Sequence, residues 1–349
     1  MSVSGTYTFT VTRDDIIRDA MLNIGKLGQS ESPTAQETTD CARKLNMMIK
    51  QWMGRIDFAP GLKVWTRKRG DLFLSSTHYM YSLGPTGDQW AGGIAVAQPN
   101  GANYAQTQIT AVAVAGQSFF SVTNAAAANM TVNDYFVIQL DSGDVATGTI
   151  GQIAAGPPGL SIIRPVPVTT YSLPSQASAG SYVWNYTTKA QRPLEIQTAI
   201  LRDAQNNDTP MNYMTLETYE QLPSKTMPTF LSDPTAIYYE AGIGSSTSTS
   251  NGTLYIDCGG AQDVTKHLHI VFLEPIMDFS NPTDNPEYPQ EWYRALCWGL
   301  SREICPMFNA PWTKEMDGNF QDAITLAQHS NAETTQIYFQ PYSASPYEP

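Results

Sequence analysis

The stretch GTYTFTVTRDDIIRDAMLNI, residues 5–24, contains the change of hydrophobic period that decides the fold. Its first half alternates apolar with polar side chains, which is the pattern of a short β-strand. After Thr12 the apolar side chains recur with a helical period, and Thr12 and Asp15 can form a capping box at the helix start. We therefore expect a strand over residues 5–12 and a helix over residues 13–27.

Outward from this stretch, amphipathic helices recur only near the two ends of the chain. A second helix is expected over residues 33–53, and two more begin at Pro289 and Pro311. Each pair has an apolar stripe that two helices alone cannot bury, so the two pairs should pack into one helical core.

The region between the helix pairs has the sequence of a β protein. Short runs rich in Val, Ile, Thr, Tyr and Phe are separated there by Gly, Pro, Asn and Asp. We expect an α+β protein with a helical core built from the N- and C-terminal helix pairs and a large all-β, sandwich-like insertion. The expected divisions are 1–61 (N-terminal strand and helical hairpin), 62–277 (β-rich insertion, with a charge-poor part at 89–188), 278–331 (C-terminal helices) and 332–349 (extended tail).

The composition excludes several classes of protein. Only 15% of the 349 residues are charged and the formal net charge is −12, so the chain lacks the positive charge with which a dedicated DNA-binding protein neutralises phosphates. It contains neither a run of about 18 apolar residues nor a secretory signal, which predicts a soluble, intracellularly made protein with no membrane partner. The four cysteines have no CxxC spacing and should be free and mostly buried.

Short motifs that carry chemistry are absent from the sequence. There is no GxSxG, no P-loop, no GxGxxG after a strand and no HExxH. His267 and His269 share one face of an expected strand, but no third ligand follows at metal-binding spacing, so we expect a solvated strand face. These patterns predict a protein that is not an enzyme and has no catalytic, cofactor-binding or metal-binding residues.

One cluster of positive charge stands out. Residues 43–69 hold 8 of the chain's 20 Lys and Arg residues, whereas residues 278–349 carry a net charge of −7. The basic residues could line a DNA channel, pair with the acidic C-terminal block of the same or a neighbouring subunit, or lie on an exposed face without a partner, and we favour pairing. They are Arg43, Lys44, Lys50, Arg55, Lys63, Arg67, Lys68 and Arg69.

The last residues of the chain combine aromatic side chains with prolines and have no period. Prolines keep such a segment extended, and aromatic side chains supply much of the energy at interface pockets, so we expect the segment to dock on a partner. The expected anchors are Ile337, Tyr338, Phe339, Tyr342 and Tyr347.

An ordered set of short motifs extends over nearly the whole chain, apart from about 89–150 and the last fifteen residues. It includes Tyr7-Thr8-Phe9, Arg13-Asp14-Asp15-Ile16-Ile17, Gly25-Lys26-Leu27-Gly28, Trp65-Thr66-Arg67-Lys68, Tyr182 to Pro193 (YVWNYTTKAQRP), Tyr219 to Lys225 (YEQLPSK) and Pro289-Gln290-Glu291-Trp292-Tyr293. In its order this set resembles the head-to-tail adaptor proteins of short-tailed bacteriophages, a family also called head-completion or packaged-DNA-stabilisation proteins.

The resemblance implies a structural virion protein at the head-tail junction, synthesised in the cytoplasm of the bacterial host. About twelve copies would form a ring beneath the portal, extend the DNA channel and help to retain packaged DNA until ejection. The implied partners are other copies of the chain, the portal protein and a tail tube or nozzle protein, while double-stranded DNA passes without sequence-specific binding. The C-terminal segment of this family reaches the portal, so residues 337–349 are the implied portal-binding segment.

Two other classes of phage tail protein have a similar composition. A tail fibre or carbohydrate-binding β protein would also be rich in Thr, Asn and aromatic residues, but it should not begin and end in paired amphipathic helices. A glycan-degrading tail enzyme would need two carboxylates in a cleft, and these come together in space rather than in sequence.

Overall fold

The chain folds into two compact units, one made of residues 1–65 and 276–349 and the other of residues 66–275. A computed structural model describes residues 9–54, 66–98, 101–227, 230–242, 251–286 and 288–330. It confirms a mixed α+β protein with a large β portion. The helices are α1 (Arg13–Asn23), α2 (Ala35–Gly54), α3 (Asn124–Ala127), α4 (Leu216–Glu220), α5 (Glu291–Ile304) and α6 (Lys314–Ser330). The strands are β1 (Arg67–Phe73), β2 (Met80–Leu83), β3 (Trp90–Gly93), β4 (Ala105–Gln108), β5 (Phe120–Thr123), β6 (Tyr135–Gln139), β7 (Val145–Ala155), β8 (Leu160–Pro165), β9 (Tyr182–Tyr186), β10 (Thr188–Lys189), β11 (Glu195–Arg202), β12 (Asp208–Pro210), β13 (Asn212–Tyr213), β14 (Leu231–Ser232), β15 (Ala236–Glu240), β16 (Gly252–Ile256), β17 (Gly260–Ala261) and β18 (His267–Leu273).

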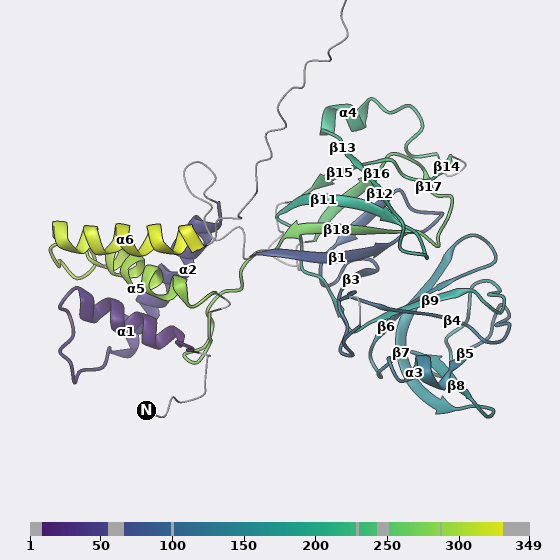
Figure 1. The fold of residues 1–349 in the computed structure, drawn as a ribbon, viewed down its shortest axis with the longest axis horizontal. Helices are drawn as coiled ribbons and strands as arrows, with labels where there is room; N and C mark the ends of the chain where they lie inside the picture. The colour runs from purple at the N-terminus through teal and green to yellow at the C-terminus, as the bar shows by residue number, and fades with distance from the viewer. Residues whose placement is uncertain are drawn as a thin grey trace, which may run out of the picture. The chain divides into compact units, whose positions relative to one another are not determined.

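The first unit, called the helical unit, contains α1, α2, α5 and α6. The helix α5 contacts each of the other three, and Figure 1 shows it between α1 and α6. Trp292 on α5 packs against Trp52 on α2 with 6.1 Å between the ring centroids. Gly299 allows the close approach of the same two helices, because a Cβ at this position would lie 2.7 Å from the Trp52 ring. On the other side, the Asn23 amide donates a hydrogen bond to Ser301 Oγ at 3.2 Å.

The helix α1 begins where the sequence predicts and ends earlier. The expected capping box is present, since the Thr12 side chain accepts from the Asp15 N–H and the Asp15 carboxylate accepts from the Thr12 N–H. These hydrogen bonds with Thr12 lower the pKa of Asp15. The helix ends at Asn23 because Gly25, with φ +69°, takes the left-handed conformation that terminates helices. The strand expected before the helix is wrong in its described part, since Phe9–Thr12 are in no strand and Val11 is instead buried as a side chain of the core.

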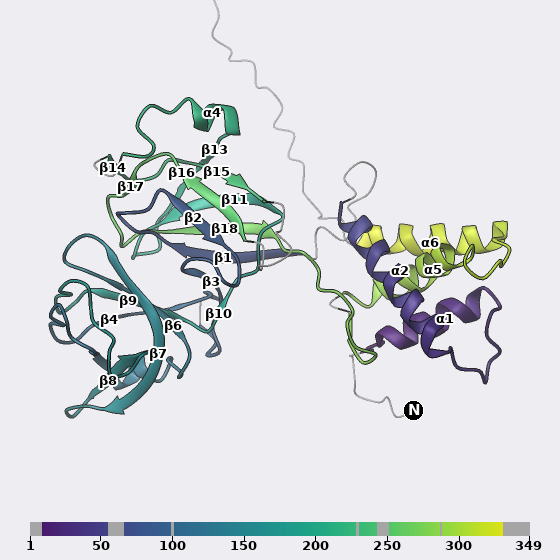
Figure 2. The ribbon, with the colours of Figure 1, turned by 180° about the vertical axis from the view of Figure 1, so that it is seen from behind.

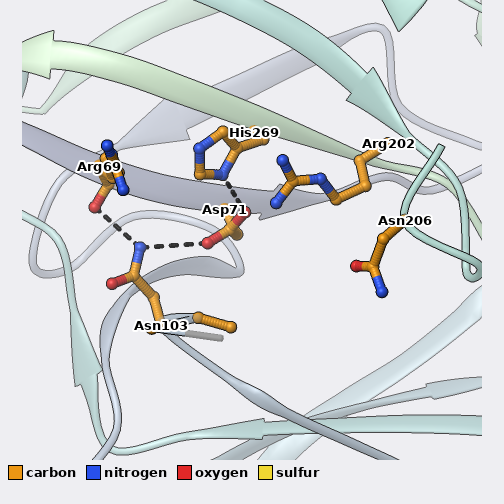
Figure 3. Close-up of a pocket in the computed structure, with 8 residues that line it drawn as sticks. Arg69, Asp71, Asn103, Arg202, Asn206 and His269 are labelled. Atoms are coloured by element: carbon orange, nitrogen blue, oxygen red, sulfur yellow. Dashed lines mark hydrogen bonds and ion pairs between the residues drawn. The ribbon is translucent and has the colours of Figure 1, made fainter. Parts of the chain in front are cut away.

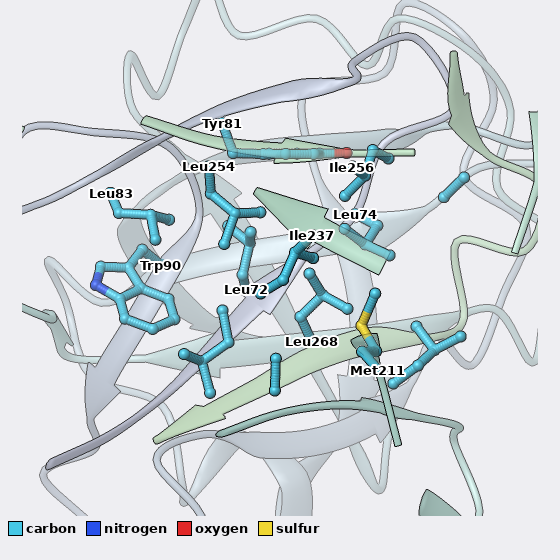
Figure 4. Packing of buried hydrophobic residues seen from close by; sticks show 14 of the residues in the cluster. Leu72, Leu74, Tyr81, Leu83, Trp90, Met211, Ile237, Leu254, Ile256 and Leu268 are labelled. Carbon is cyan, nitrogen blue, oxygen red and sulfur yellow. The ribbon is translucent and has the colours of Figure 1, made fainter. Parts of the chain in front are cut away.

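The second unit, called the β unit, contains two sheets that pack around one apolar core. The first sheet has the strand order β10-β3-β1-β18-β11-β12, and the second has the order β13-β15-β16-β2. Leu72 and Leu268 from the first sheet meet Ile237 and Leu254 from the second, and all four are fully buried (Figure 4).

A third sheet of the β unit, with the order β4-β9-β6-β7-β8-β5, has an apolar core of its own. The long strand β7 changes register between Ile150 and Gln152, and its curvature lets it pair with β6 on one side and β8 on the other (Figure 2). An aromatic contact joins this sheet to the first one, since Phe73 on β1 lies 5.2 Å from Trp184 on β9 between ring centroids.

The expectation of an all-β insertion is wrong at two places. The short helices α3 and α4 interrupt the strands, and α3 covers most of the Ala run at 125–128. Both begin at a threonine N-cap, because the side chains of Thr123 and Thr215 accept hydrogen bonds from backbone N–H groups three residues later. A helix of one turn leaves too few residues for a periodic pattern, so local capping is the only sequence signal.

Candidate functional site

The outer face of the first sheet carries a group of polar side chains. Residues alternate along β1, so Asp71 points away from the apolar core that contains Leu72. The strand β18 pairs antiparallel with β1 and places His269 opposite Asp71. On its other edge β18 pairs with β11, which places Arg202 opposite His267. Side chains from three neighbouring strands therefore meet on one face of the sheet.

Asp71 is the centre of this group, and it is only 1% exposed. His269 Nδ1 lies 2.7 Å from Asp71 Oδ1, and the Asn103 amide donates to Asp71 Oδ2 at 3.1 Å (Figure 3). The same amide donates to the backbone oxygen of Arg69 at 2.9 Å. These contacts hold the loop before β4 against β1 and give the buried carboxylate the hydrogen bonds that offset its desolvation.

His267 corrects the expectation of a solvated strand face. Its side chain is fully buried and His269 is half-buried, because Phe73 and Tyr104 cover the end of the strand at the contact with the third sheet. His267 Nε2 lies 3.0 Å from the Tyr104 hydroxyl and 3.7 Å from Asp71 Oδ1, while Nδ1 has no hydrogen-bond partner among the described residues. Burial lowers the pKa of His267 to about 4, so the ring is neutral at pH 7.

Arg202 is fixed by an ion pair at two points. Its Nε and Nη2 donate to the two carboxylate oxygens of Asp208 at 2.7 and 2.9 Å. The hydrogen bonds from Arg202 lower the pKa of Asp208. The third guanidinium nitrogen, Nη1, has no partner within the described ranges, and Figure 3 shows the guanidinium directed toward Asp71. A turn between β11 and β12 places Asn206, whose φ is +65°, beside this pair.

These side chains line a cavity of about 340 Å³, which we call the Asp71 cavity. Arg69 also lines it and is exposed, and its guanidinium has no ion-pair partner in the described part of the chain. None of the lining residues has a hydroxyl or thiol group, so the Asp71–His269 pair has no nucleophile there to activate. Searching the described residues finds no group of three or more His, Cys, Asp or Glu that could hold a metal ion. The lining residues are Arg69, Asp71, Gly101, Ala102, Asn103, Arg202, Asn206 and His269.

The basic residues predicted from the sequence fall in both units. Lys50 forms an ion pair with Asp278 at 2.9 Å, which joins the basic stretch to the acidic C-terminal block within one chain, and Arg43 pairs with Asp40 at 3.3 Å. Among the described members of the basic stretch, Arg69 alone lines the Asp71 cavity. Arg43, Lys44 and Lys50 are on α2, Arg67, Lys68 and Arg69 are on β1, and Arg55 and Lys63 lie outside the described residues.

The predicted portal-binding anchors also lie outside the described residues. They are Ile337, Tyr338, Phe339, Tyr342 and Tyr347. The four cysteines are free as expected; three are buried, and the fourth, Cys297, is half-buried.

No protein-family model matches the chain, and no curated protein matches it significantly. No helix in the described ranges is long and apolar enough to cross a membrane.

Most of the Asp71 cavity has no signal in the sequence. Of its lining residues, only Arg69 and His269 belong to patterns that the sequence makes visible, the basic stretch and the His-x-His alternation. Asp71 and His269 are 198 residues apart in sequence, and the pairing of β1 with β18 brings them together. Strand order is set by packing between distant segments, so a local pattern could not have identified the cavity.

Proposed function

We propose that the chain is a structural virion protein, a head-to-tail adaptor that forms a ring of about twelve copies between the portal and the tail of a short-tailed phage. In this proposal the two terminal helix pairs form the ring, and the ring extends the DNA channel and helps to retain packaged DNA. The observation that carries it is the construction of the helical unit, in which helices from both ends of the chain contact α5 and the β unit is inserted between them. The resemblance of the ordered motifs to the adaptor family supports the same conclusion.

Exposed apolar side chains of the helical unit also favour assembly. Met47 on α2 is 60% exposed and Leu326 on α6 is 61% exposed. A ring repeats one heterologous contact, in which a face of one subunit covers a different face of the next. Such a contact would remove these side chains from water.

The charge of the chain suits a channel that DNA passes through. A net charge of −12 gives little phosphate neutralisation, so DNA that passes through the channel would not bind tightly to its wall. Lys44 and Lys68 have no ion-pair partner in the described residues and would pair with acidic residues of a neighbouring subunit or the portal. Ring assembly should then weaken as salt rises above physiological levels, because exposed pairs are screened over about 8 Å. Tight, salt-sensitive binding of free duplex DNA by the isolated protein would favour a DNA contact instead.

Negative-stain imaging of the purified protein, with and without its portal, tests the proposal directly. Rings are the expected result, whereas isolated elongated particles under both conditions would contradict the proposal and favour a tail fibre. The variant Leu326→Glu should reduce ring formation by placing a charge in the apolar contact. Thr325→Glu adds the same charge at the adjacent exposed position and serves as the matched control.

Truncation after Gln336 tests the role of the tail. The proposal places residues 337–349 on the portal, so the truncated protein should fold normally and attach poorly to portal rings. Sedimentation of portal mixed with full-length or truncated protein measures the attachment. Equal co-sedimentation of the two proteins would exclude the tail as the portal-binding segment.

A further inference from the structure

Part of the Asp71 cavity is built from side chains that hydrogen bonds hold in place. Asp71 is buried and held by His269 and the Asn103 amide, and Arg202 is held at two points by Asp208. The volume of the cavity, about 340 Å³, lies at the lower end of the ~300–1,000 Å³ typical of small-molecule sites. A ligand the size of one monosaccharide would fit, and two of the groups that would touch it, Arg202 and the Asn103 amide, are already positioned.

The charges of the cavity favour a ligand with one carboxylate. The Asp71 carboxylate is 1% exposed and is already hydrogen-bonded to His269 and the Asn103 amide, and the Asp208 carboxylate is paired with Arg202. This leaves Arg69 as the positive charge without a partner in the described residues, with the free Nη1 of Arg202 beside the same cavity. Guanidinium groups bind carboxylates through two parallel hydrogen bonds, so these nitrogens provide a carboxylate site.

The remaining lining groups suit hydroxyl groups. The Asn103 amide nitrogen already donates to Asp71 and to the Arg69 backbone, which leaves its Oδ1 as an acceptor. Asn206 contributes a whole side-chain amide from the exposed turn. A hydroxyl both donates and accepts, so it needs acceptors such as Asn103 Oδ1 and donors such as the Asn206 amide within one site.

We infer that the Asp71 cavity binds a sugar acid, a small polyhydroxylated ligand with one carboxylate. The carboxylate would lie against Arg69 and Arg202, and the hydroxyl groups would lie against the two asparagine amides. The site would bind its ligand without hydrolysing it, because glycoside hydrolysis requires two carboxyl groups and Asp71 is the one carboxylate among the described residues that line this cavity. The inference does not depend on ring formation, because every residue it uses lies in the β unit.

Titration of the full chain with glucuronate, followed by ligand-observed NMR, tests the inference. Three comparison ligands separate the contribution of the carboxylate from that of the hydroxyl groups. Glucose lacks the carboxylate, acetate lacks the hydroxyl groups, and inorganic phosphate is a simple anion. We expect saturable binding of glucuronate at millimolar concentrations and binding at least about tenfold weaker for each comparison ligand, because the charged and the hydroxyl contacts are both required.

Three variants make the test specific to the cavity. Arg69→Gln should weaken glucuronate binding by about tenfold or more, because it removes a charge-assisted contact. Lys68→Gln removes the same charge from the adjacent position of β1, whose side chain points to the other face, and should leave binding within about twofold. Asn206→Gly removes the amide but keeps the positive φ of the turn, and should weaken binding by a few fold without unfolding the protein.

Three results would overturn the inference. The first is the absence of saturable glucuronate binding by the wild-type chain, and the second is binding of acetate or phosphate as tight as that of glucuronate. The third is an equal effect of the Arg69 and Lys68 variants. Ring assembly measured on the same samples distinguishes failure of this inference from failure of the proposed function, since none of the three variants alters the helical unit.

Discussion

Both units of the molecule place a glycine against a tryptophan ring, but the two rings are held differently. A Cβ on Gly70 would lie 2.4 Å from the ring of Trp90, which is 0% exposed, donates a hydrogen bond from Nε1 to the Gln191 oxygen and packs on Phe272 of the same sheet. A Cβ on Gly299 would lie 2.7 Å from the ring of Trp52, which is 8% exposed and packs on Trp292. The Trp90 ring is therefore completely buried and hydrogen-bonded, whereas the Trp52 ring keeps a small exposed fraction.

The largest effect is expected from removing the aromatic centre of the helical unit. Trp292 is 1% exposed, so Trp292→Ala should lower the free energy of unfolding by about 3–5 kcal/mol through lost burial and a residual cavity. Trp298→Ala, on the same helix but only half-buried, is the matched control and should cost clearly less. Chemical denaturation of both variants measures the difference. Overlapping transitions for the wild type and Trp292→Ala would contradict the packing of α5 on α2.

Acid should destabilise the β unit through His267. Its folded-state pKa of about 4 lies below the usual 6.5, so the unfolded chain binds more protons between these two values and stability falls as the pH drops through this window. The loss should approach about 3 kcal/mol by pH 4, since each pKa unit corresponds to about 1.4 kcal/mol. Urea denaturation at pH 7 and pH 4.5 measures it. The variant His267→Gln has no such titration and should show a shallower pH dependence; identical slopes would exclude His267 as the cause.

Replacing Gly70 in the β unit by alanine should lower the free energy of unfolding somewhat less than Trp292→Ala or the protonation of His267. Gly70→Ala forces the Trp90 ring to move within an enclosed core, and overpacking of this kind costs about 1–3 kcal/mol. Thermal or chemical denaturation gives the value. A variant as stable as the wild type would contradict this prediction, because it would mean that the core around the Trp90 ring is less tightly packed than the burial of the ring indicates.

The smallest effect is expected at the corresponding glycine of the helical unit. Gly299→Ala also crowds a tryptophan, but the Trp52 ring is less completely buried than the Trp90 ring, and alanine stabilises a helix by about 1 kcal/mol relative to glycine. We expect a net change of less than about 1 kcal/mol in the same denaturation assay. A loss equal to that of Gly70→Ala would remove the distinction between the two units.

The sequence predicts the type of each long element better than its ends or partners. The capping box at Thr12 and Asp15 is local, so the start of α1 could be read directly. Its end could not, because Gly25 and Gly28 are equivalent in sequence and only one of them is left-handed. The helices α3 and α4 are each a single turn, too short for a period to appear.

The candidate site was less predictable than the fold because it depends on strand order. The alternation of His267 and His269 shows that they share a face, but not that Phe73 and Tyr104 cover one of them. Arg202 carries no local signal, and it reaches the Asp71 cavity because β11 pairs with β18. Contacts of this kind follow from packing between distant segments, which one sequence does not encode in any local pattern.

The pairing of β1 with β18 has a consequence for the order of folding. Arg67 lies opposite Leu273, so the chain enters and leaves the β unit at adjacent positions. Closing a loop as long as residues 66–275 would cost about 3–4 kcal/mol more than closing a short one, and the ladder between these strands offsets that cost. During synthesis the β unit is complete before α5 is made, and domains generally fold as units. Folding of the β unit therefore brings the chain segment after Leu273 close to the segment before Arg67. The helix α5 can then pack against α1 and α2 as soon as α5 leaves the ribosome.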